Sequence, residues 1–135
     1  MPLTPLSALS PLDGRYHKQL EPLRAILSEA GLIRARVRVE VEWLLALGEE
    51  PAIEEIPPFT RGSVGALRGL VAGFGDADAE RVKAIEATIN HDVKAIEYWL
   101  KERVAGHGEL ERAAEFIHFA CTSEDINNQI GRAHV

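Results

Sequence analysis

The stretch that most constrains the fold of this chain is residues 33–43, in which apolar and charged residues alternate. Alternation with a period of two is typical of a half-buried strand. The same residues also suit a helix, because Val37 and Val41 would then share a face. Arg36 and Glu40 would form an opposite-charge pair four residues apart. No second alternating run of comparable strength could pair with a strand here, so the pattern favours a helix and an all-α chain.

The rest of the chain predicts short helices separated by turns and loops. Residues 1–16 indicate an extended arm with turn chemistry, in which Asp13-Gly14 suits a tight turn with positive φ. A helix is expected from about His17, with a break or bend at Gly31. After a loop over residues 48–58, apolar residues at helical spacing predict four further helices, over about 60–74, 77–89, 92–105 and 109–121.

Composition limits the classes of function. The 135 residues carry a formal net charge of −6, which gives no basic field for a nucleic-acid partner. The single cysteine, Cys121, cannot form an internal disulfide, and no apolar run is long enough to span a bilayer. The N-terminus makes a poor signal peptide, so a cytoplasmic protein with no membrane partner is expected. Because potential ligands do not recur at metal-ligand spacing, no metal site is expected.

Three polar strings interrupt the helical pattern: SPLDGRY at 10–16, NHDV at 90–93 and CTSEDINN at 121–128. In the second string, Asn90 or Asp92 could simply cap a helix, although a cap does not require His91 between them. The functional alternative is an imidazole oriented and kept charged by the adjacent carboxylate, which would suit a bound phosphate or carboxylate at a helix start. The residues alone leave both alternatives open.

The other two strings have similar alternatives. Thr122 with Asp125 three residues on resembles a capping box, which spacing alone favours over a carboxylate-binding site at the same helix start. Arg15 beside a glycine and before Tyr16 could be a surface residue after a turn, or part of a compact phosphate grip. His118, on the predicted helix 109–121, is expected to be structural.

Together, in this order and separation, the strings resemble those of the adenylosuccinate lyase family of the fumarase/aspartase superfamily. The resemblance runs from Leu9 to Asn128 and includes KAIE at 83–86. It implies the all-α N-terminal helical domain of that superfamily, truncated before the long central helix bundle. Residues 1–110 would form the N-terminal helical domain, and 111–128 would begin the central one.

The resemblance also implies an activity and residue roles. The family eliminates fumarate from adenylosuccinate, giving AMP, and from a succinylated aminoimidazole carboxamide ribotide, by general acid/base catalysis in a homotetramer without a cofactor. By matching positions, His91 would assist catalysis while also binding substrate. The implied substrate contacts are the nucleotide phosphate for Arg15 and Tyr16, the substrate body for Asn90, His91 and Asp92, and the succinyl carboxylates for Thr122 and Ser123.

Departures from the family pattern set further expectations. The downstream Thr-His-x-Gln-Pro and Ser-Ser-x-Met-Pro strings, which carry the general acid and the catalytic serine, do not occur in this sequence. The chain by itself is therefore expected to be inactive. The alternatives are a sibling lyase acting on another fumarate adduct, or a non-catalytic helical nucleotide-binding module. Residues 129–135 depart from the family, and ATC GGA AGA GCA CAC GTC, a common adapter sequence, would encode 130–135, so a non-native read-through tail is expected.

Overall fold

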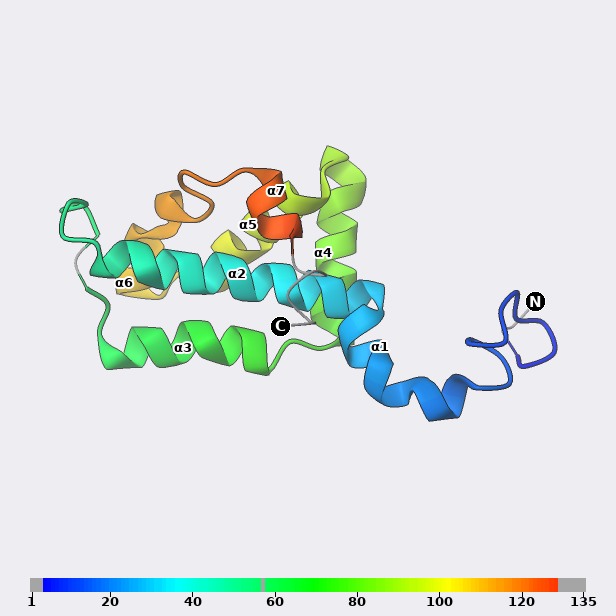
Figure 1. The fold of residues 1–135 in the computed structure, drawn as a ribbon. Coiled ribbons are helices and arrows are strands. Elements are labelled where there is room, and N and C mark those ends of the chain that lie inside the picture. The colour runs from blue at the N-terminus through cyan, green and yellow to red at the C-terminus, as the bar shows by residue number, and fades with distance from the viewer. Residues whose placement is uncertain (1–3, 57, 129–135) are drawn as a thin grey trace. The chain divides into compact units, whose positions relative to one another are not determined.

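The computed structural model describes residues 4–56 and 58–128, and these residues form helices and turns without a strand (Figure 1). The all-α prediction is thus confirmed. The chain divides into two compact units, Met1–Leu32 and Ile33–Val135, each described by itself below. The tail expected at 129–135 lies outside the described residues, and the domain division expected at residue 110 stays a prediction.

The first unit contains a 3-10 helix, His17–Leu20, followed directly by α1, Glu21–Leu27. The prediction of a helix from His17 is therefore confirmed. The expected positive φ in the Asp13-Gly14 turn is wrong, because neither residue has it. Gly14 is needed for space instead, since a Cβ there would lie 3.0 Å from the Pro5 carbonyl oxygen.

The helix break lies at Ser28, not at Gly31 as expected. Ser28 is extended, with φ −76° and ψ 166°, and α2 then runs over Glu29–Glu49. The Ser28 hydroxyl accepts a hydrogen bond from the Gly31 N–H at 3.1 Å, as a helix N-cap does. Gly31 lies inside α2, where a Cβ would come within 2.8 Å of the carbonyl oxygens of Ala25 and Ile26. The glycine therefore permits close backbone approach, and the serine makes the break.

In the second unit, the alternating segment is helical as predicted and forms the middle of α2. Val37 and Val41 are fully buried. The expected ion pair between Arg36 and Glu40 does not form, because each side chain reaches another part of the unit. Burial of one face, together with these longer-range contacts, thus makes the segment a helix.

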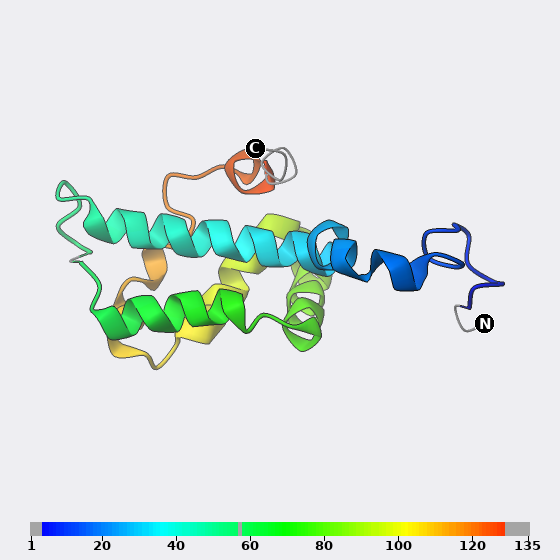
Figure 2. The same ribbon diagram turned by 60° about the horizontal axis from the view of Figure 1, so that its bottom comes forward.

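Three of the predicted helices agree with the structure to within about two residues: α3 (Arg61–Ala72), α4 (Asp76–Ile89) and α5 (Asp92–Val104). Figures 1 and 2 show α3 running alongside α2. The two helices are joined by Arg68, whose guanidinium makes two 3.0 Å hydrogen bonds to Glu42. α4 and α5 pack against each other, and α5 contributes buried residues that include Ile96 and Trp99.

The helix predicted over residues 109–121 is wrong. The structure has α6 (Gly108–Arg112), a 3-10 turn (Ala114–Phe116) and, only after an irregular segment, α7 (Ser123–Asn127). His118 and Ala120 have left-handed backbones, with φ 66° and 58°, which end any helix. No helix in the described part of the chain is long and apolar enough to cross a membrane.

Candidate functional site

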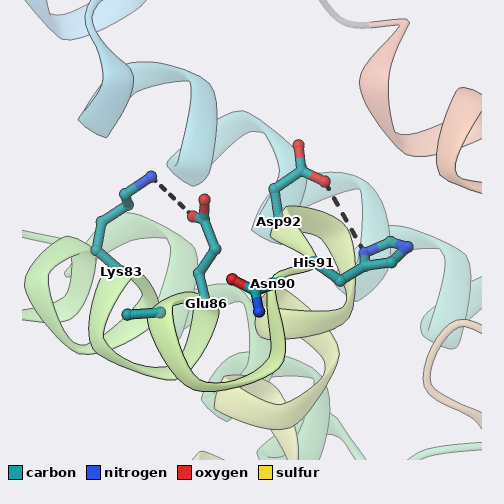
Figure 3. Close-up of a pocket in the computed structure, with 6 residues that line it drawn as sticks. Lys83, Glu86, Asn90, His91 and Asp92 are labelled. Carbon is teal, nitrogen blue, oxygen red and sulfur yellow. Dashed lines mark ion pairs between the residues drawn. The ribbon is translucent and has the colours of Figure 1, made fainter.

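The junction of α4 and α5 forms an open hollow of about 500 Å³ that brings three of the predicted site residues together (Figure 3). Figure 3 shows the side chains of α4 on one side and the first residues of α5 on the other. The lining residues are Lys83, Glu86, Ala87, Asn90, His91 and Asp92.

The chain turns sharply here because Asn90 adopts the left-handed conformation, with φ 53° and ψ 37°, and so ends α4. Asparagine tolerates this conformation better than most residues. The predicted cap of α5 was Asn90 or Asp92, and this is corrected by the structure. His91 is the N-cap, and its Nδ1 accepts a hydrogen bond from the Lys94 N–H at 3.1 Å.

The hydrogen bond that caps α5 determines which nitrogen of the His91 ring can donate to a ligand. Because Nδ1 accepts a hydrogen bond, the proton of the neutral ring lies on Nε2. Asp92 Oδ1 is 3.9 Å from Nδ1 and accepts a hydrogen bond from the Val93 N–H at 2.8 Å. The geometry therefore leaves Nε2 as the ring nitrogen that can donate to a ligand.

Asp92 is held by a residue from a distant part of the sequence. Arg36 of α2 is buried, and its Nη2 lies 2.8 Å from Asp92 Oδ2. Partial burial acts to raise the pKa of Asp92, but the Val93 N–H and the Arg36 guanidinium hold that pKa below its ordinary value. Asp92 is therefore an oriented carboxylate. No sequence pattern indicated this contact, since helical spacing paired Arg36 with Glu40.

Lys83 and Glu86 complete the hollow, with Lys83 Nζ 2.8 Å from Glu86 Oε2. They belong to the KAIE string of the family resemblance, yet they were not predicted as site residues. The available signal was helical spacing, which places Lys83, Glu86 and Asn90 on one face of α4. The hollow therefore offers an ammonium, an amide and an imidazole N–H beside two carboxylates. Such a mixture suits a polar ligand that both donates and accepts hydrogen bonds.

Thr122 and Ser123 lie outside this hollow, at the start of α7. The predicted capping interaction is confirmed, because the Thr122 N–H and hydroxyl donate to Asp125 Oδ2 at 2.7 and 3.0 Å. These two bonds lower the pKa of Asp125. Among the described residues no partner binds the Ser123 hydroxyl, which makes it the more available donor of the two.

Arg15 and Tyr16 belong to the first unit, which is described by itself. The Arg15 guanidinium lies 5.9 Å from the centre of the Tyr16 ring, and both residues are exposed. At this distance a cation–π contact holds the two side chains together. Their charged and phenolic groups are thus adjacent and open to an anionic ligand.

Volume alone does not single out the α4–α5 hollow, because another of about 450 Å³ lies between α3 and α6. There the Glu109 carboxylate accepts hydrogen bonds from Thr60 and Ser63, which lower its pKa. These hydrogen bonds already use the polar groups of that hollow to join the start of α3 to α6. In the α4–α5 hollow, the His91 Nε2–H remains available, so we take it as the candidate site. The described residues include no group of three potential metal ligands.

Comparisons with known proteins show the family to which the chain is similar. A family model described as "Lyase" matches residues 14–130. Adenylosuccinate lyase of Haemophilus influenzae is 58% identical over 128 residues, covering 95% of this chain and 28% of that protein. The enzyme of the same name from Escherichia coli K12 is 56% identical over the same shares, and one from Legionella pneumophila strain Corby is 42% identical. The chain thus spans 28% of the length of these relatives.

Proposed function

Because this chain belongs to the lyase family that its residues 14–130 match, we propose that it is the N-terminal part of an adenylosuccinate lyase. The observation that carries the proposal is the 56–58% identity to two such enzymes over 95% of the chain, a span that includes all three polar strings. The proposed reaction is elimination of fumarate from adenylosuccinate, and from the succinylated aminoimidazole carboxamide ribotide.

The α4–α5 hollow is the proposed contact with the body of the substrate. His91 donates from Nε2 to a substrate oxygen, since its Nδ1 is committed to the cap of α5. Asp92, fixed by Arg36, accepts from a substrate N–H or hydroxyl. Asn90 can do both. These residues orient the substrate and assist proton transfer, while the main acid and base are assigned to the part of the enzyme that follows.

Thr122 and Ser123 are the proposed donors to a succinyl carboxylate. Charge develops next to that carboxylate when a proton leaves the neighbouring carbon, so oriented donors there stabilise the transition state. The uncommitted Ser123 hydroxyl supports this role, and Thr122 would join it by leaving Asp125. Arg15 and Tyr16 are the proposed phosphate contacts, supported by their exposed, adjacent positions.

The proposal includes the assembly and location of the whole enzyme. A homotetramer in the cytoplasm is the arrangement that the family resemblance suggests. The free cysteine, Cys121, agrees with a reducing compartment.

A chimera tests the proposed activity. Residues 1–128 are joined to the remainder of the Haemophilus influenzae adenylosuccinate lyase, and fumarate release from adenylosuccinate is followed. We expect the chimera to release fumarate and the 135-residue chain alone to release none above the blank, because the main acid and base are absent from it. Activity of the chain alone would contradict the proposal that the main acid and base lie in the part of the enzyme that follows. A folded, tetrameric chimera without activity would overturn the assignment to this enzyme.

A further inference from the structure

The segment between the 3-10 turn and α7 is strained in a way that its sequence does not require. His118 and Ala120 both adopt positive φ, although neither is glycine or asparagine. Such backbones cost free energy and persist only where the surroundings over-determine them. The segment ends at Thr122 and Ser123, so its path decides where those two residues lie.

Two side chains of α2 hold this segment in place. Glu40 Oε1 lies 2.5 Å from Nδ1 of His118, the first strained residue. One helical turn along, the Trp43 indole N–H donates to the Phe119 carbonyl oxygen at 2.7 Å. Residues three apart on a helix share a face, so α2 presents both contacts to consecutive residues of the segment.

Fold stability alone does not explain the Glu40 contact. The Glu40 side chain is fully buried, and its Oε2 has no hydrogen-bond partner among the residues that the structure describes. Burial raises the pKa of Glu40; the bond to His118 opposes the rise, whereas the charge of Glu97 adds to it. A buried polar contact of this kind gives little net stability over an apolar replacement. The contact does, however, fix the orientation of the His118 ring.

We propose that Glu40 and Trp43 are positioning residues, which hold the left-handed turn at 118–120 so that Thr122 and Ser123 meet a carboxylate of the substrate. This inference rests on the proposed function for its last step only. The first step, that the two side chains fix the turn, concerns the chain without any ligand. Three features carry it together: two strained residues, two directed contacts from one helix face, and the adjacent Thr122–Asp125 cap.

The turn itself is tested by amide hydrogen exchange, followed by NMR on the 135-residue chain. The reporter is the Cys121 N–H, which donates to the His118 carbonyl oxygen at 3.3 Å. Glu40→Leu and Trp43→Phe should each speed its exchange at least about fivefold, the factor expected for losing one net hydrogen bond. Glu49→Leu, the same substitution at an exposed glutamate of α2, should leave it unchanged. Unchanged exchange in both test variants would refute the positioning role.

Two further readouts separate positioning from general destabilisation. The amide of Leu100, buried in α5, reports on global opening, and its exchange should accelerate less than that of Cys121 in each test variant. Equal acceleration at Leu100 and Cys121 would overturn the inference. Glu40→Gln keeps an acceptor for His118, so it should stay closer to the parent than Glu40→Leu.

The link to the substrate is tested with fumarate as the probe. In the parent chain, fumarate should shift the amide signals of Thr122 and Ser123 in a saturable way. Glu40→Leu and Trp43→Phe should raise the Kd for fumarate at least about fivefold, while Glu49→Leu should not. Unaltered binding in the test variants would overturn the inference. If fumarate shifts neither signal in the parent, the proposed role of Thr122 and Ser123 fails, and the exchange experiment alone then decides whether α2 fixes the turn.

Discussion

Replacing His91 by alanine in the chimera should lower kcat/KM for adenylosuccinate at least about 100-fold, the range expected for losing a group that assists proton transfer. The stability effect should be far smaller, about 1 kcal/mol, because only the N-cap of α5 is lost. Steady-state kinetics and urea unfolding of the same samples measure the two effects.

Two matched variants show which role of His91 matters. His91→Asp retains a side-chain acceptor for the cap, so it should keep the parent stability and still lose activity. His107→Ala changes another exposed histidine at a helix start, one that makes no side-chain cap bond. It should alter neither activity nor stability. A His91→Ala chimera within about threefold of the parent would show that His91 serves only as a cap.

Replacing Trp99 by alanine should cost about 3–5 kcal/mol of unfolding free energy, the range for truncating a buried aromatic residue. Trp99 is 1% exposed and packs edge-on against Phe74, with ring centres 5.3 Å apart. The substitution would leave a cavity between α5 and the connection from α3 to α4, where Phe74 lies. Because a small domain has only a few kcal/mol of net stability, the cooperative urea transition should shift far down or disappear.

The neighbouring Tyr98 provides the control. Tyr98 is 42% exposed, and Lys94 Nζ lies 5.4 Å from the centre of its ring. Tyr98→Ala should therefore cost less than about 1 kcal/mol. Far-UV circular dichroism in urea measures both variants. Similar losses for the two would contradict the burial seen in this structure.

Much of the fold could be predicted because local pattern and tertiary packing agree. Apolar spacing located α3, α4 and α5, and the absence of a pairing partner for a strand decided the alternating segment. The Thr122–Asp125 cap was also predicted, since its donor and acceptor are three residues apart. Local chemistry suffices for features of this kind.

The rest depends on contacts between residues distant in sequence. The end of the helix predicted over 109–121 could not be foreseen, because no glycine or proline marks it and the turn is bound by Glu40 and Trp43, more than 70 residues earlier. The contact of Arg36 with Asp92 likewise spans 56 residues. At the candidate site, sequence identified Asn90, His91 and Asp92 but assigned the cap to the wrong one.

The position of bound substrate distinguishes the α4–α5 hollow from the hollow between α3 and α6. NMR signals of the 135-residue chain are followed while adenylosuccinate is added. We predict saturable shifts at the amides of Asn90, His91 and Asp92, with those of Thr60 and Ser63 unchanged. Shifts confined to the hollow between α3 and α6, with none at residues 90–92, would contradict the claim that the α4–α5 junction is the substrate site.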